Sequence, residues 1–348
     1  MHKSSKYVII LIILLSSSLF SRMIYAQKND TLFHTNGNIL TGEVKKFTKG
    51  LLYFSMDGMG TIKVENEEIK SLKTNKFLRI LTKNNEIFYG DIDSSNNWGE
   101  LRIGLLDERT IIKVSDIVEI FPIKNTFWLR LSGHADLGLD YTKANKIFRI
   151  NGSGAINYQK EKWAWAFKYN GNDSWQKIDT MVYTSKTDFN LSNEYILTPR
   201  WRLTSTIGRN TNTELGLQSR WFAGGYMKNF LLQTNRAYLD YLVGIEANIE
   251  QNNSNEYKNN LELIIGGDFS IFKYQSPEIS LNTYAKVIPS LVSKGRWRFD
   301  SGLDARIEVF TDFYLSFKIY FQYDSKPIEI NANNNDYSFS TGFGYTFN

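Results

Sequence analysis

The stretch that decides the fold of this chain is residues 340–348, Ser-Thr-Gly-Phe-Gly-Tyr-Thr-Phe-Asn, at the C-terminus. Apart from Thr341, every second residue from Tyr337 to Phe347 is aromatic, and the residues between them are small or polar. Successive side chains of a β-strand point to opposite faces. The pattern therefore predicts a strand with an aromatic face towards lipid and a small, polar face towards a lumen.

The same stretch contains a candidate assembly signal, made of Ser340, Gly342, Tyr345 and Phe347. A polar residue, a glycine two positions later and two aromatic residues spaced by one resemble the signal that outer-membrane β-barrels present to their assembly machinery. Asn348 follows the last aromatic residue, which departs from the usual end of such a barrel. The expected partners are therefore outer-membrane lipid and the barrel-assembly machinery of a Gram-negative cell.

The N-terminus predicts export. Residues 1–26 have the pattern of a signal peptide, with Lys3 and Lys6 before an apolar run at 8–14 and a cleavage site at 24–26. The alternative is an uncleaved anchor, but serines interrupt the apolar run before the roughly 20 residues that a helical span needs. The chain has no cysteine, which excludes a lipoprotein anchor, a disulfide framework and a thiolate metal site.

The composition favours a barrel over a helical membrane protein. Mean hydropathy is −0.34, which a barrel tolerates because only alternate residues face lipid. Aromatic residues make up 15% of the 348 residues, as expected where Trp and Tyr form girdles at the two membrane surfaces. The net charge of +5 is spread out rather than clustered beside stacking aromatic residues, so we predict no nucleic-acid partner.

A tandem repeat follows the signal peptide. Residues 36–44 align with 84–92, and 62–64 align with 112–114, which gives a period of about 50 residues. Each copy has short alternating segments beside turn pairs and no helical period, so we predict a tandem SH3-like β-module over 27–122 in the periplasm. Its role is either a structural plug or adaptor, or a module that binds a ligand or a periplasmic partner.

The remaining residues, 123–348, predict an antiparallel transmembrane β-barrel of about 12 strands, an even number as bacterial barrels require. From residue 127 onward the two-residue period persists, and it is poorest in the sixth segment. The segments are 127–141, 148–159, 163–171, 183–197, 201–210, 216–228, 235–250, 259–273, 278–291, 296–310, 313–324 and 336–347. Alternation alone does not distinguish inside from outside, so a soluble β-sandwich or a lipocalin-like barrel is the alternative.

The predicted connections also differ between the two ends of the barrel. Tight turns are expected at 160–162, 198–200 and 311–312, and longer external loops at 172–182, 251–258 and 325–335. Short periplasmic turns and longer external loops are typical of outer-membrane barrels. The links 229–234 and 292–295 do not follow this trend.

The polar face of the predicted strands carries many charges. They act either as structural packing of the lumen or as the selectivity lining of a narrow pore. The candidate lumen-lining residues are Arg130, His134, Asp136, Asp140, Glu246, Asp268, Arg298, Asp300, Asp304, Arg306, Glu308 and Lys318.

A catalytic site is not predicted. After residue 26 the chain has two histidines, His34 and His134. A lipase-type barrel needs a serine with a histidine base, and its serine would face lipid, whereas His134 belongs to the predicted lumen face. We therefore expect no enzyme activity, no cofactor and no metal, with a hydrolase that uses His134 as a remaining alternative.

The layout resembles a family of unknown function described as salt-induced outer membrane proteins. The resemblance rests on residues 136–145, Asp-Leu-Gly-Leu-Asp-Tyr-Thr-Lys-Ala-Asn, on the signal peptide and on the aromatic strands that end at Phe347. It covers the barrel half best, and implies an outer-membrane barrel without catalytic residues. The leading hypothesis is a structural or envelope-stress role, and the alternative is a small pore for ions or solutes.

Overall fold

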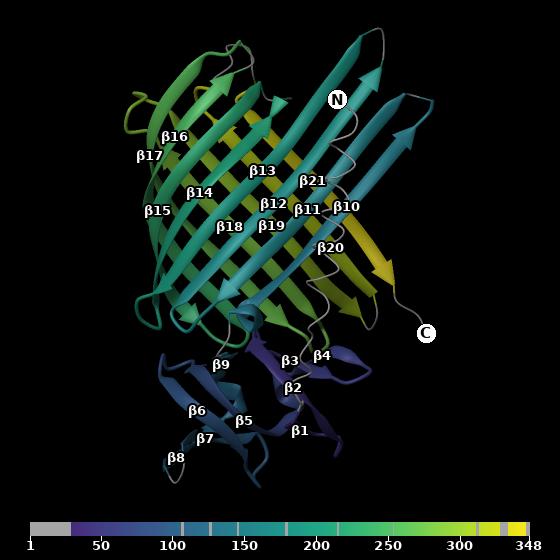
Figure 1. Cartoon of the computed structure of the whole chain (residues 1–348), viewed down its shortest axis with the longest axis vertical. Helices are drawn as coiled ribbons and strands as arrows, with labels where there is room; N and C mark the ends of the chain where they lie inside the picture. Colours follow the sequence, from purple (N-terminus) through teal and green to yellow (C-terminus); the bar gives the residue numbers. More distant parts are fainter. Residues whose placement is uncertain are drawn as a thin grey trace, which may run out of the picture.

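The computed structural model describes residues 29–105, 108–124, 127–144, 146–177, 180–213, 216–252, 254–310, 313–327 and 333–345. The predicted signal peptide, the predicted turn at 311–312 and Phe347 lie outside the described residues. The described chain is nearly all β, and it forms one nine-stranded and one twelve-stranded antiparallel sheet. Figure 1 shows the nine-stranded sheet, the module, below one end of the larger sheet.

The module begins with β1 and ends with β9, and it repeats one order of elements. Three strands, a short 3-10 turn and a further strand occur first as β2 to β5 and then as β6 to β9. The strands are β1 (Asp30–His34), β2 (Ile39–Thr48), β3 (Leu51–Met56), β4 (Gly60–Glu65), β5 (Ile69–Thr82), β6 (Ile87–Ser94), β7 (Glu100–Leu105), β8 (Glu108–Lys113) and β9 (Ile117–Pro122), with the turns η1 (Asn66–Glu68) and η2 (Val114–Asp116).

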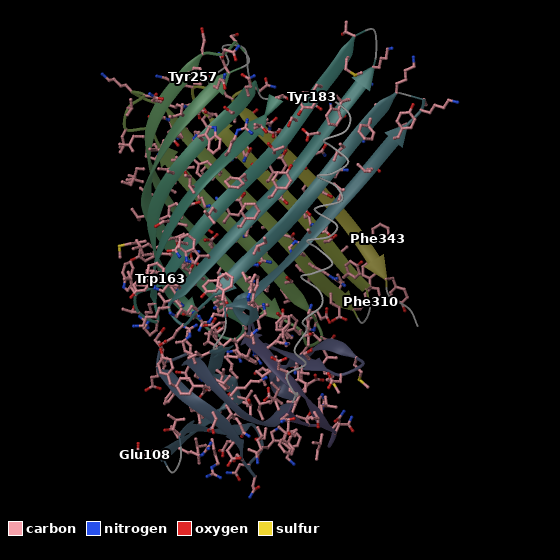
Figure 2. The ribbon with its side chains drawn as sticks, viewed as in Figure 1. Glu108, Trp163, Tyr183, Tyr257, Phe310 and Phe343 are labelled. Atoms are coloured by element: carbon pink, nitrogen blue, oxygen red, sulfur yellow. The ribbon has the colours of Figure 1, made fainter. Side chains whose placement is uncertain are left out.

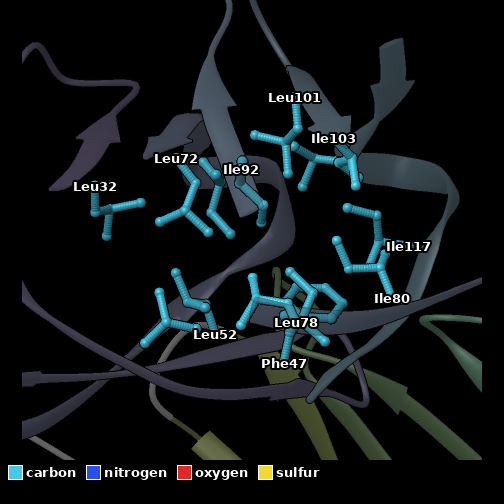
Figure 3. Packing of buried hydrophobic residues seen from close by; sticks show 14 of the residues in the cluster. Leu32, Phe47, Leu52, Leu72, Leu78, Ile80, Ile92, Leu101, Ile103 and Ile117 are labelled. Carbon is cyan, nitrogen blue, oxygen red and sulfur yellow. The ribbon is translucent and has the colours of Figure 1, made fainter. Parts of the chain in front are cut away.

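The two copies share one hydrophobic core rather than forming two separate ones. Phe47 and Leu52 of the first copy belong to the same buried cluster as Ile92 and Ile103 of the second (Figure 3). Strand β9 also pairs with both β2 and β5 and thereby joins the copies. The module therefore folds as a single unit.

The twelve-stranded sheet runs in simple consecutive order from β10 to β21. Its strands are β10 (Leu131–Thr142), β11 (Ile147–Gln159), β12 (Trp163–Lys177), β13 (Met181–Ile196), β14 (Trp201–Asn212), β15 (Leu217–Gln233), β16 (Ala237–Asn252), β17 (Tyr257–Lys273), β18 (Ile279–Pro289), β19 (Trp297–Phe310), β20 (Phe313–Asp324) and β21 (Asn335–Tyr345). Each predicted segment corresponds to one of these strands. A short turn, η3 (Trp128–Arg130), precedes β10 within the first predicted segment.

The predicted long loop at 172–182 is wrong. Strands β12 and β13 continue through most of it, and their pairing extends to Lys177 opposite Met181. The segment is polar, but a β-ladder is held by backbone N–H and C=O groups, which pair whatever the side chains are. Likewise, most of 229–234 belongs to β15.

The larger sheet rolls up. In Figure 1 the teal and green strands in front cross the yellow-green strands behind them. Lys186 and Asp188 of β13 line the same cavity as Asp324 of β20 and Asp336 of β21, so strands far apart in the sheet face one another across its concave side. The sheet is not closed, since among the described residues no pairing joins β10 to β21.

Candidate functional site

The convex face of the rolled sheet carries exposed aromatic side chains at both of its ends. Figure 2 shows Tyr183 and Tyr257 at the end far from the module, and Trp163 and Phe310 at the end near it. These side chains are 43–68% exposed. At the near end Trp163 packs on Tyr195 with ring centroids 4.4 Å apart, and at the far end Trp297 packs on Tyr323 with centroids 4.7 Å apart.

The concave face carries a buried charge cluster near the far end. At its centre is Glu262 of β17, which is fully buried. Its carboxylate accepts hydrogen bonds from Arg220 Nη2 of β15 at 2.9 Å and from Arg298 Nε of β19 at 3.1 Å. The amides of Asn248 and Asn260 donate to the same carboxylate at 2.7 and 2.8 Å. These contacts neutralise a charge whose unpaired burial would be very costly.

A second part of this cluster is centred on Arg296, which precedes β19. Its guanidinium donates to both carboxylate oxygens of Glu250, at 2.9 and 3.2 Å, and to both of Asp324, at 3.1 and 2.6 Å. Two bidentate contacts fix the orientation of the guanidinium group. We refer to the whole set as the outer charge cluster; it consists of Arg220, Glu246, Glu250, Glu262, Arg296, Arg298 and Asp324.

The outer charge cluster joins strands that are not neighbours in the sheet. Glu250 and Arg296 come from β16 and the start of β19, and Glu262 and Arg298 come from β17 and β19. Such contacts form only because the sheet curves around them. The cluster borders an upper cavity of about 310 Å³, and the residues that line this cavity are mostly charged or amide side chains.

A larger cavity of about 630 Å³, the lower chamber, lies nearer the module. Lys228 of β15 spans two carboxylates there, with Nζ 2.9 Å from Asp268 and 3.1 Å from Asp240. Asp304 and Lys318 line the chamber and lie 3.6 Å apart. Lys49, from the module, also reaches this chamber.

The module contacts the near end of the sheet through its turns. Asn235 Nδ2, between β15 and β16, donates to the carbonyl of Ser115 at 3.4 Å, and Arg236 pairs with Glu67. The neighbouring Tyr274 lies just after β17, where burial and nearby acidic groups raise its pKa to about 12. The module is therefore docked on the sheet rather than only tethered to it.

The structure brings several predicted lumen residues together. Glu246 and Arg298 belong to the outer charge cluster, and Asp300 lines the upper cavity beside it. The lower chamber contains Asp268, Asp304 and Lys318.

The predicted residues of β10 are not part of either group. Arg130 donates to the carbonyl of Lys124 at 2.7 Å, in the segment that leads from the module to the sheet. His134 and Asp136 lie 4.0 Å apart and are largely exposed, and Asp140 accepts a hydrogen bond from Asn151. Strand β10 lies at the edge of the sheet, so its polar side chains have neighbours on one side only.

Two predicted residues near the end of β19 also lie apart from both groups. The Arg306 guanidinium lies 3.8 Å from the ring centroid of Tyr314, and Glu308 accepts from the backbone N–H of Glu278 at 2.9 Å.

The candidate assembly-signal residues lie on β21, the last strand. Ser340 and Gly342 are opposite Lys318 and Ser316 of β20, and Tyr345 is opposite Phe313. Tyr345 is exposed, as an aromatic residue on the convex face is expected to be.

Sequence reasoning did not name Arg220 or Arg296, and the candidate lumen-lining residues did not include Glu250, Glu262 or Asp324. Arg220 lies in the sixth predicted segment, where alternation is poor. Arg296 precedes Arg298 and Asp300 by two and four positions, so the two-residue period carries it to the same face. This two-residue spacing in the sequence is sufficient to assign Arg296 to the polar face of the strand.

Within the described residues no group of three or more His, Cys, Asp or Glu side chains is placed to hold a metal ion. In the same part of the chain, no helix is long and apolar enough to cross a bilayer.

Comparison with known proteins gives one family. The model of a family described as "Protein of unknown function, DUF481" matches residues 135–347, which is most of the twelve-stranded sheet. No curated protein matches the chain. The match confirms that the resemblance seen in the sequence is to a family of unknown function, while the description of its members as salt-induced stays a prediction.

Proposed function

Because the chain belongs to the DUF481 family, whose function is unknown, we propose from its geometry that it is an outer-membrane β-barrel with a structural or envelope-stress role and no enzyme activity. The twelve-stranded sheet spans the outer membrane, and the module, a tandem of two SH3-like repeats that share one core, lies in the periplasm. The partners are outer-membrane lipid, the barrel-assembly machinery and periplasmic components that the module contacts.

The observation that carries this proposal is the presence of exposed aromatic side chains at both ends of the convex face (Figure 2). Trp and Tyr side chains prefer the two interfaces of a bilayer, where their rings meet the acyl chains and their polar groups meet water. In a soluble protein, rings such as Trp163 and Trp297, each more than 40% exposed, would leave much of their apolar surface in water. The arrangement supports a girdle at each membrane surface.

The structural role is supported by the outer charge cluster. Its arginines and carboxylates are buried and mutually paired, so they fill the concave side near the far end instead of leaving free charges for a passing solute. Side chains fill small barrels in this way, whereas wide barrels keep aqueous channels.

The location is tested by reconstituting the purified chain into vesicles whose acyl chains carry bromine. Bromine quenches tryptophan fluorescence on contact, so Trp163, Trp165 and Trp297, on the exposed face, are expected to lose a large part of their emission. A chain that stays soluble without detergent and shows no quenching would remove the membrane location and the roles built on it.

A second candidate function is a small pore. It is favoured by the two cavities, of about 310 and 630 Å³, which lie on the concave side of one sheet and both have charged side chains in their walls. Planar-bilayer recording distinguishes the candidates: a plugged barrel gives no steps above background, whereas a pore gives steps whose ion selectivity follows its lining charges.

A further inference from the structure

The lower chamber lies where the twelve-stranded sheet meets the module. Its walls come from strands β15 to β21, and one further residue, Lys49, comes from the turn between β2 and β3 of the module. Its volume of about 630 Å³ falls within the range of sites that hold small organic molecules.

The sheet gives the chamber an excess of negative charge. Three carboxylates and two ammonium groups of the sheet line it: Asp240, Asp268, Asp304, Lys228 and Lys318. Lys228 is shared between Asp240 and Asp268. The pair of Asp304 and Lys318 is loose, with both side chains more than half exposed and their charged atoms 3.6 Å apart. Asp304 therefore stays accessible to another cation.

The chamber is also lined by aromatic rings, which attract cations over their faces. Phe230, Tyr238, Tyr284 and Tyr320 contribute to its walls. The chain already places its own ammonium groups over rings in and beside the chamber. Lys228 Nζ lies 5.9 Å from the centroid of Phe230, and Lys286 Nζ lies 5.5 Å from that of Tyr284.

Lys49 is the third ammonium group, and it balances the charge of the chamber. Its Nζ lies 5.8 Å from the ring centroid of Phe272, close to where β17 ends. The turn that carries it is held against the sheet, since Gly50 approaches the carbonyl of Asn235 so closely that an added Cβ would lie 2.7 Å from it. The module thus presents one ammonium group to a chamber that lacks one.

We propose that the lower chamber is a binding site for a small organic ammonium compound and that Lys49 is a tethered competitor for it. A free ammonium ligand would lie among the aromatic rings with its charge towards Asp268 and Asp304. Because the site is defined by contacts within the chain, this inference does not depend on the membrane location proposed above.

The test is binding of choline to the purified full-length chain, measured by titration calorimetry. The neutral isostere 3,3-dimethylbutan-1-ol, which has the same shape without the charge, is the matched probe. We expect saturable binding of choline and at least tenfold weaker binding of the alcohol. The change Lys49→Met, which keeps an apolar stem, is expected to tighten choline binding by roughly threefold to tenfold, because it removes a competing charge beside the rings.

Two further variants complete the test. Lys46→Met is the control for Lys49→Met, since Lys46 lies three residues earlier, on β2, with its ammonium group over the Tyr53 ring, 4.7 Å from the centroid. The choline affinity of Lys46→Met is expected to equal that of the unchanged chain. Asp304→Asn, at an exposed position, is expected to weaken choline binding at least threefold while circular dichroism stays the same.

The inference is overturned by any of three results. The alcohol binds as tightly as choline, choline shows no saturable binding, or the Lys49→Met and Lys46→Met chains bind choline equally.

Discussion

At the scale of the residue, Gly50 and Gly99 hold equivalent places in the two copies of the repeat but meet different neighbours. Both precede the second strand of their copy and have positive φ angles, +74° and +70°. A Cβ on Gly50 would meet the carbonyl of Asn235, whereas a Cβ on Gly99 would have no atom within 4 Å among the described residues. The two positions therefore share a backbone requirement, and only Gly50 contacts the larger sheet.

The change Gly50→Ala is expected to loosen the docking of the module, whereas Gly99→Ala is not. Both variants should lose about 1 kcal/mol of module stability, because alanine is strained at positive φ. Cleavage by trypsin after Lys124, which is half-buried between the module and the sheet, measures the docking. Faster cleavage in both variants alike would show that the contact with Asn235 plays no part.

Acidic residues of the module make its stability depend on pH, and the direction of each contribution follows from the pKa shift of the residue. Glu43 of β2 is partly buried, which by itself would raise its pKa, but the ammonium groups of Lys45 and Lys76 outweigh burial and hold the pKa below 4.5. A carboxylate with a lowered pKa stabilises the fold above the pKa of the unfolded chain, and that contribution is lost as the pH falls through the folded value. The contribution of Glu43 to the stability of the module should therefore be lost as the pH falls below about 4.5.

Glu65, in the same module, has a pH-dependent contribution to stability of the opposite sign to that of Glu43. Its pKa is raised, first by burial and then by the neighbouring carboxylates of Glu68 and Glu67. The change Glu43→Gln should speed hydrogen exchange in β2 at pH 7 but not at pH 3, while Glu65→Gln should slow exchange at pH 7. The intrinsic rate of hydrogen exchange changes with pH, so each variant is compared with the unchanged chain at the same pH. A Glu43→Gln effect of equal size at both pH values would contradict the assignment.

At the scale of the element, the two-residue period predicted all twelve strands of the larger sheet, because the convex and concave faces of the rolled sheet require different side chains and successive residues of a strand point to opposite faces. It was least clear in β15, and the structure gives the reason. The pairing of β15 with β16 shifts between Leu217 and Ser219 and again between Phe230 and Leu232. Each shift inserts an extra residue, which moves the following side chains to the other face.

The same reasoning explains why the site was only partly predictable. Periodicity assigns a residue to a face, and so it placed Glu246, Arg298 and Asp268 on the polar face. Which charges meet depends on how far the sheet curls, because Arg296 reaches Glu250 from a strand three positions away in the sheet. No local pattern contains that information.

The outer charge cluster should stabilise the strands that it joins. The change Glu262→Gln leaves Arg220 and Arg298 buried without their shared carboxylate. Breaking a buried ion pair in this way costs on the order of 3 kcal/mol. We expect a lower temperature for the heat-induced shift in gel mobility of the folded chain.

The control for this prediction is Asp304→Asn, which breaks an exposed pair with Lys318 and should cost less than about 1 kcal/mol. If the two variants lost equal stability, the cluster would have no special part in holding β15, β17 and β19 together.

At the scale of the whole molecule, the two edge strands of the larger sheet, β10 and β21, decide whether the sheet closes into a barrel. The sheet has twelve strands in consecutive antiparallel order. Because twelve is an even number, the first and last strands run antiparallel to each other and can pair. Within a bilayer an unpaired strand edge has no water to satisfy its N–H and C=O groups, and each unsatisfied group costs several kcal/mol. We therefore predict that β10 and β21 pair when the chain is in a membrane.

Cysteine cross-linking tests this pairing directly, because the natural chain has no cysteine. A cysteine replaces Leu137, an exposed residue of β10, and a second is scanned through Tyr337, Phe339 and Phe343 on the exposed face of β21. The pair Leu315 and Phe343, which lie opposite each other on β20 and β21, is the positive control. If the barrel is closed, the cysteine at position 137 forms a disulfide within one chain with the cysteine at one of the scanned positions. The yield of this disulfide should be near that of the control pair. Disulfide-linked dimers would mean that each edge pairs with a second copy, and no cross-link at any position beside an efficient control would mean that the sheet stays open.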